Sequence, residues 1–257
     1  MNRILNCIPS RNTELDWTAR DAAESGMLLA FGQLPESVDL REDWWAIGDQ
    51  GASGSCVGWG AADSVIRWHM VKTERLAPHE LLSVRYIWMA AKETDQFTAR
   101  PTSFIESEGT SLKAALDIAR KYGVVLDSDL PFTQNVLYQG NTNTFYALAA
   151  RLKINAYFNL HTNTREWCTW LANNGPILIA TNIDETWDNA TDNRGHLDVY
   201  KPDTTRGGHA IALVGYTPNY LIVRNSWGTG WGDNGFAYAS YDYASRAFME
   251  AYGVTLA

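Results

Sequence analysis

The sequence predicts an α+β fold in which a helical first half is followed by a half built mainly of strands. Apolar residues recur at helical spacing before residue 150, whereas short β-type runs bounded by Gly, Asn and Asp follow Lys153. Helices and strands do not alternate, so a sheet of βαβ units is not expected. We therefore expect one domain over residues 35–257, with a mainly helical lobe at about 35–150 and a mainly β lobe at about 151–257.

The first predicted helix covers residues 55–73. Val57, Ala61, Val65 and Trp68 lie on one face of it, because they follow one another at intervals of four, four and three residues. Further helices are expected to open at 77–80 and to cover 112–122 and 164–173.

Local signals set the expected ends of these elements. Ser111 and Thr164 are the expected N-caps, and Gly123 is expected to end the helix that Ser111 begins. The expected strands are 154–160, 177–181, 209–216, 220–224, 236–241 and 248–254.

Composition and charge exclude several classes of protein. Lys and Arg number 21 against 29 Asp and Glu, giving a net charge of −8 without the basic cluster that nucleic acid requires. No apolar run approaches the roughly 20 residues of a membrane-spanning helix, so no membrane partner is expected. The N-terminus lacks the apolar core of a secretory signal, which predicts a cytoplasmic protein as made, with export by another route left open. The sequence does not specify an oligomeric state.

The three cysteines, Cys7, Cys56 and Cys168, are too few and too far apart for a disulfide scaffold or a metal cluster. We expect a fold without an essential disulfide, and neither a metal nor an organic cofactor. Cys168 is flanked by Trp167 and Trp170 and is expected to be a buried packing residue.

Cys56 lies at the first turn of the first predicted helix, after a glycine-rich turn. The positive end of a helix dipole and the unpaired backbone N–H groups stabilise a thiolate there, and the same groups can stabilise an oxyanion. A small buried packing residue is the alternative for a free cysteine, and this segment alone leaves both roles open.

His209 begins an apolar strand after two glycines, where a structural histidine is the alternative to a catalytic one. Asn225 follows sixteen residues later and opens a loop rich in tryptophan and glycine. One strand–turn–strand hairpin has this length, so the two side chains should meet. An amide oxygen can then accept a hydrogen bond from the imidazole and fix its orientation.

Together these segments resemble the papain family of cysteine peptidases. Gln50 stands six residues before Cys56, His209 follows much later, and Asn225-Ser226-Trp227-Gly228 closes the set. Weaker likeness at 34–41 and 108–111 extends the resemblance over most of residues 34–241. The family's fold has a helical and a β-barrel-like lobe with the active cleft between them.

The resemblance implies a role for each matching residue. Cys56 would be the nucleophile, His209 its proton partner, and Asn225 the group that orients the imidazole. Gln50 would join the Cys56 backbone N–H in an oxyanion hole, and Trp227 would shield the hydrogen bond between Asn225 and His209. The reaction would be hydrolysis of a peptide or protein substrate, typical of an endopeptidase, through an acyl-enzyme.

Substrate contacts are implied for Gly109, Thr110, Leu112, Ala180, Gly208 and Ala210. Of these, Leu112, Ala180 and Ala210 would line a roomy apolar pocket for the side chain two residues before the cut.

The sequence departs from the family's pattern at several positions. Ser53 stands where a disulfide-forming cysteine is common, and Val57 where an aromatic residue often follows the nucleophile. His209 lies 153 residues after Cys56, slightly beyond the usual roughly 130–150. This distance implies an insertion, which we place around 184–205. The departures suit a bacterial-type member without disulfides, and they bear on substrate preference.

Two alternatives use the same residues. One is an acyltransferase or transglutaminase-type enzyme, which Gln50 and the loop at 225–235 disfavour. The other is a catalytically degenerate papain-like fold retained as a binding module, which the four competent side chains disfavour.

Residues 1–34 are too short for the helical leader domain that is typical of the family. We expect either a strap that packs on the back of a lobe, or a short pro-segment that lies extended over Cys56 as in a zymogen. In the second case residues 27–31 (Met-Leu-Leu-Ala-Phe) offer an apolar plug.

Overall fold

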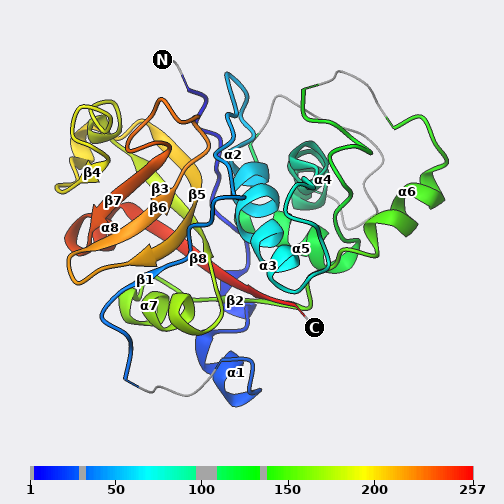
Figure 1. Ribbon diagram of the computed structural model, residues 1–257, viewed down its shortest axis with the longest axis horizontal. Coiled ribbons are helices and arrows are strands. Elements are labelled where there is room, and N and C mark those ends of the chain that lie inside the picture. Colours follow the sequence, from blue (N-terminus) through cyan, green and yellow to red (C-terminus); the bar gives the residue numbers. More distant parts are fainter. Residues whose placement is uncertain (1–2, 29–32, 97–108, 134–137, 257) are drawn as a thin grey trace.

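The computed structural model describes residues 3–28, 33–96, 109–133 and 138–256, and it confirms the predicted α+β fold. Figure 1 shows the two lobes side by side, with α2 to α5 on one side and β3 to β8 on the other.

A long central helix carries Cys56 at its first position. It consists of α2 (Cys56–Gly58), the π-helical η2 (Trp59–Ile66) and α3 (Arg67–Lys72), in agreement with the helix predicted at 55–73. This helix packs closely on both lobes. A Cβ on Gly58 would lie 2.6 Å from the Val84 carbonyl of the helical lobe, and one on Gly60 would lie 2.9 Å from Leu178 of the β lobe.

The other helices of this lobe differ in part from the prediction. The helix expected to open at 77–80 begins instead at α4 (Val84–Gln96), because Leu82 pairs with Leu126 and the Ser83 hydroxyl accepts a hydrogen bond from Tyr86 N at 3.1 Å. α5 (Leu112–Lys121) has Ser111 as its N-cap, as predicted. α6 (Thr142–Ala149) was not predicted.

The β lobe is a sheet in the order β2-β8-β3-β5-β6-β7-β4, with β1 paired to β5. Its strands are β1 (Val38–Asp39), β2 (Ala156–Asn159), β3 (Ile177–Ile183), β4 (His196–Leu197), β5 (Gly207–Tyr216), β6 (Tyr220–Arg224), β7 (Phe236–Ser240) and β8 (Phe248–Thr255). All neighbours are antiparallel except β4 and β7. The six predicted strands are present with small shifts at their ends.

Helices cover this sheet. α7 (Thr164–Asn173) has the predicted bounds, but the expected N-cap, Thr164, is wrong. The Asn163 side chain caps the helix by accepting hydrogen bonds from Arg165 N and Glu166 N. α8 (Tyr241–Ala247) was not predicted. The segment at 184–205, expected as an insertion, holds η3 (Glu185–Trp187), β4 and η4 (Pro202–Thr204) between β3 and β5.

The N-terminal chain runs between the two lobes before it reaches the far side of the molecule, as the blue trace in Figure 1 shows. There it forms η1 (Thr13–Leu15) and α1 (Ala19–Glu24). The predicted apolar plug at 27–31 is wrong in its described part. Leu28 N donates to Ala22 O at 3.1 Å, which folds the buried Leu28 back onto α1 and away from Cys56. Residues 29–31 lie outside the described part of the chain.

The three cysteines are free and buried, as predicted for a fold without a disulfide. Within the described ranges, no helix is long and apolar enough to cross a membrane.

Candidate active site

Cys56 is fully buried where the central helix begins, at the junction of the lobes. Backbone pairing with the β lobe holds the loop before it. Gln50 N donates to Ser226 O at 2.9 Å, and Gly228 N donates to Gly48 O at 3.0 Å. The position of the thiol is therefore fixed from both lobes.

β5 and the end of β6 bring His209 and Asn225 together. His209 Nε2 lies 2.8 Å from Asn225 Oδ1, and both side chains are buried. Asn225 Oδ1 also accepts from Ser226 N at 2.8 Å, which holds the amide in place. His209 Nδ1 has no hydrogen-bond partner in the described part of the chain, while the backbone N–H of the next residue, Ala210, is near enough to Cys56 to lower the pKa of its thiol. The unpaired Nδ1 is thus the ring nitrogen of His209 that remains free for proton exchange.

Burial keeps both groups neutral in this structure. It lowers the pKa of His209 to about 4, against the opposing effect of the hydrogen bond to Asn225. Burial likewise raises the pKa of the Cys56 thiol, although hydrogen bonds from the backbone of Ala210 and Asn6 act in the opposite direction. A thiolate–imidazolium pair needs water or a polar substrate in the cleft.

The amide of Gln50 is buried and oriented by two hydrogen bonds. Its Oε1 accepts from Ser226 Oγ at 2.9 Å, and its Nε2 donates to Ser53 O at 3.0 Å. The amide nitrogen carries two hydrogens, so the second can point toward an oxyanion on a carbonyl attacked by Cys56.

Tryptophans form a wall behind His209. The Trp227 ring lies 4.8 Å from the imidazole, centroid to centroid, and the Trp187 ring lies 5.9 Å from it at a steep angle. Trp231 stacks on Trp187 at 5.1 Å. Trp187 was not among the predicted site residues. It comes from the segment at 184–205, where a tryptophan within a polar stretch was the one signal available.

The chain's own N-terminal segment occupies the cleft. Thr110 N donates to Asn6 O at 3.2 Å, Ile8 N donates to Thr110 O at 3.1 Å, and Cys7 N donates to Gly208 O at 3.1 Å. Residues 6–8 are therefore bonded to both lobes at once. Sequence reasoning placed an inhibitor here as one alternative but did not identify these residues.

Asn6 lies next to Cys56, because its backbone N–H lowers the pKa of the thiol and its side chain packs against Gly54, where an added Cβ would clash with Asn6 Nδ2. Beyond it, Ser10 N donates to Glu250 Oε1 at 2.8 Å and Ser10 Oγ accepts from Lys113 N at 3.2 Å. The segment thus closes the cleft across its width.

The residues expected to contact substrate lie along this segment. Thr110 and Gly208 bond to it, and a Cβ on Gly109 would clash with the Asn6 carbonyl. Leu112, Ala180 and Ala210 are buried in one cluster with Cys7 and Cys56.

Other candidate groups lie apart from this site. Cys168 is in α7, with its sulfur 3.7 Å from the Tyr241 hydroxyl. No group of three or more metal-ligating side chains is found among the described residues.

Comparison with known proteins identifies the family. The model of the "Papain family cysteine protease" matches residues 34–254. Vignain from Vigna mungo is 27% identical over 220 residues, which cover 82% of this chain and 55% of vignain. Cathepsin J from Mus musculus is 26% identical over 224 residues, which cover 82% of this chain and 61% of that protein. The chain thus spans little more than half the length of these relatives.

A solved structure has the same fold. The crystal structure of xylellain, a cysteine protease from Xylella fastidiosa, aligns with a TM-score of 0.79 at 19% sequence identity, and the alignment covers 100% of this chain and 98% of that one.

Proposed function

Because the chain belongs to the papain family of cysteine proteases, we propose that it hydrolyses peptide bonds with Cys56 as nucleophile and His209 as general acid and base. One observation carries this assignment. His209 is held by Asn225 through Nε2 at 2.8 Å, which leaves Nδ1 as the ring nitrogen that can exchange a proton with Cys56.

The proposed reaction has two stages. The Cys56 thiolate attacks the substrate carbonyl carbon and forms a C–S bond, while Gln50 Nε2 and the Cys56 backbone N–H stabilise the oxyanion. The C–N bond then breaks, and the leaving amine takes its proton from the His209 imidazolium. Water, deprotonated by His209, attacks the thioester and releases the acid and the free thiol. Asn225 keeps the ring oriented throughout.

We infer further that the chain with residues 3–8 in the cleft is latent. Asn6 covers the sulfur, and the hydrogen-bonding groups of Thr110 and Gly208 are already used. A substrate must displace the segment before it can bind. The rate for every substrate is therefore multiplied by the same factor, the open fraction, which is the fraction of molecules whose cleft the segment has left.

The proposed pocket for the side chain two residues before the cut has buried, mostly small walls at Leu112, Ala180 and Ala210. An apolar side chain should be preferred there. A peptide library that varies this position tests the preference, and enrichment of Asp, Glu or Arg would contradict it.

Substitution of the catalytic pair tests the function itself. Cys56→Ala and His209→Ala should each abolish peptide hydrolysis, because the two groups act as one unit. Cys168→Ala is the matched control and should retain activity. Retention of more than a few per cent of activity in Cys56→Ala or in His209→Ala would refute the assignment. All variants should be assayed as the full chain and as a chain that begins at Arg11.

A further inference from the structure

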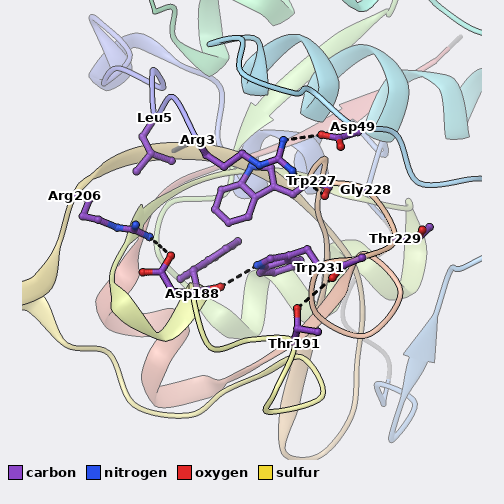
Figure 2. Close-up of a pocket in the computed structure, with 12 residues that line it drawn as sticks. Arg3, Leu5, Asp49, Asp188, Thr191, Arg206, Trp227, Gly228, Thr229 and Trp231 are labelled. Carbon is purple, nitrogen blue, oxygen red and sulfur yellow. Dashed lines mark hydrogen bonds and ion pairs between the residues drawn. The ribbon is translucent and has the colours of Figure 1, made fainter. Parts of the chain in front are cut away.

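At the Trp227 end of the cleft, the side chain of Arg3 occupies a site built for a cation. Its guanidinium donates to Asp49 Oδ1 at 2.7 Å, to Gly51 O at 2.9 Å and to Trp227 O at 3.1 Å. It also lies 5.9 Å from the centroid of the Trp227 ring. Figure 2 shows Arg3 extended over Trp227 with its end beside Asp49. A carboxylate, two carbonyls and an aromatic face together recognise a guanidinium or an ammonium group.

Contacts that do not involve Arg3 hold this site together. Asp49 and Trp227 form an antiparallel bridge, and Gly228 N donates to Gly48 O at 3.0 Å. Asp49 Oδ1 also accepts from Gly51 N at 2.8 Å. The two loops that supply the acceptors are therefore fixed to each other, and the site should persist when Arg3 leaves it.

The site opens into a cavity of about 470 Å³ lined by Arg3, Asp49, Asp188, Arg206, Trp227 and Trp231, among others. Its second acidic side chain is already paired, because Asp188 Oδ1 lies 3.0 Å from Arg206 Nη2. Asp49 is thus the carboxylate in this cavity that faces Arg3.

The position of the site along the cleft indicates which part of a substrate would reach it. The pocket at Leu112 and Ala180, proposed for the residue two before the cut, lies at the Thr110 end, where residues 6–8 bind. Arg3 lies at the opposite end, beside Trp227, three residues from the Asn6 that covers Cys56. This is the leaving-group side.

We propose that this site binds an arginine or lysine of the peptide substrate on the leaving-group side, within three residues of the cut, and that Arg3 takes its place in the closed chain. This inference rests on the proposed peptidase function and adds a substrate class to it. Peptides with such a basic residue should be cleaved in preference to neutral ones.

The first experiment measures a ratio of rates in the full chain. Two sets of fluorogenic peptides differ only by Arg or Gln at the first, second or third position after the cut. At one of these positions kcat/KM should favour Arg by about tenfold. The open fraction of the chain cancels from this ratio, because it scales both peptides equally.

Two variants test whether the preference for Arg comes from Asp49. In Asp49→Asn the ratio should fall to about twofold or less, whereas in Asp188→Asn, the matched control in the same cavity, it should keep its value. Cleavage of both peptides with no preference for Arg at any position would overturn the inference and leave the peptidase function standing. A preference that survives Asp49→Asn would also overturn it.

A second experiment needs no catalysis. In the full chain with Arg3→Ala, N-acetyl-arginine amide should cause a saturable change in tryptophan fluorescence, because it returns a guanidinium to the face of Trp227. N-acetyl-glutamine amide should not cause this fluorescence change in Arg3→Ala. The arginine probe should not cause it in the wild-type chain, where Arg3 fills the site, or in the double variant Arg3→Ala and Asp49→Asn. Equal responses to the two probes, or none to either, would overturn the inference. If the arginine probe binds but no peptide is cleaved by any variant, the peptidase function fails and the cation site stands.

Discussion

The protonation states of Cys56 and His209 depend on whether water reaches the cleft. In the closed chain, burial lowers the pKa of His209 to about 4 and raises that of Cys56. At neutral pH the imidazole is then neutral, and the raised pKa of the thiol disfavours the thiolate. When the N-terminal segment leaves, water reaches both groups, the pKa of His209 rises and that of Cys56 falls, so the ion pair becomes the favoured form.

Alkylation of Cys56 at pH 6 tests this dependence. Removal of residues 1–10 should accelerate its reaction with iodoacetamide by about tenfold or more, since the thiolate is the reactive form. His209→Ala in the shortened chain should remove most of the gain, and the slow labelling of Cys168 should not change. Equal Cys56 rates with and without the segment would mean that it neither covers the thiol nor sets its ionisation.

The oxyanion donor can be tested against the residue that positions it. Gln50→Ala should lower kcat by roughly 100- to 1,000-fold, the range found when one such donor is removed. Ser226→Ala should cost less, because it removes only the hydroxyl that holds Gln50 Oε1 at 2.9 Å and leaves the amide present. Steady-state kinetics on the chain that begins at Arg11 measures both. Equal losses in the two variants would mean that Gln50 acts only through its packing.

Three of the site residues could be singled out from the sequence because each lies in a local motif with its own signal. Cys56 follows a glycine-rich turn at the start of a helix, and His209 and Asn225 are separated by one hairpin. The role of Gln50 followed only from the resemblance to the papain family. Trp187 and Arg3 could not be found in this way. Their contacts with the site come from tertiary folding of segments whose local sequence shows no motif.

At the scale of elements, the apolar stripe predicted the central helix, start and stop signals marked α5 and α7, and β-type runs bounded by Gly, Asn and Asp predicted the six main strands. The errors occur where a side chain decides a boundary. Ser83 delays the start of α4 and Asn163 caps α7 in place of Thr164, because hydrogen bonds to backbone N–H groups outweigh propensity at a helix end. α6 and α8 have only eight and seven residues, too few for a sustained periodic signal.

A buried charge cluster joins the central helix to the β lobe. Arg224, at the end of β6, donates to Asp63 Oδ2 at 2.8 Å, to Ser64 Oγ at 2.6 Å and to Ala46 O at 2.6 Å. Asp63 Oδ1 also accepts from Arg67 Nη1 at 3.2 Å. Arg224 directly precedes Asn225, so the cluster helps to set the distance between the two halves of the active site.

Asp63→Asn should destabilise the protein by about 3–5 kcal/mol, because it leaves Arg224 as a buried cation without its carboxylate. Glu24→Gln is the matched control. It breaks the exposed pair of Glu24 with Arg20 and should leave the free energy of unfolding nearly unchanged, because solvent screens this pair. Urea unfolding at pH 7 measures both. A loss below about 1 kcal/mol for Asp63→Asn would show that the cluster contributes little to the joining of the lobes.

At the scale of the whole molecule, the N-terminal segment has two parts with different contacts. Residues 3–10 cross the cleft and are held by hydrogen bonds, by the ion pair of Arg3 and by the burial of Cys7. Residues 13–28 pack behind the β lobe, where Ala22 and Leu28 are buried and Asp16 bonds to the Tyr252 hydroxyl at 2.7 Å. We propose that the two expectations drawn from the sequence, an inhibitor and a stabilising strap, correspond to successive stretches of one segment.

Two shortened chains separate these contributions. A chain that begins at Arg11 keeps the packed part, so its free energy of unfolding should stay within about 1 kcal/mol of the full chain while its peptidase activity rises. A chain that begins at Gln33 also loses the burial of Leu28 and α1 and should lose about 3 kcal/mol or more.

Urea unfolding and peptide hydrolysis, measured on the same preparations, decide between the roles. If the chain from Arg11 is no more active than the full chain, residues 3–10 do not inhibit. If the chain from Gln33 is as stable as the full chain, residues 13–28 are not a strap. Arg3→Glu in the full chain gives an independent check, because it places a negative charge beside Asp49 and should open the cleft without removing any part of the backbone.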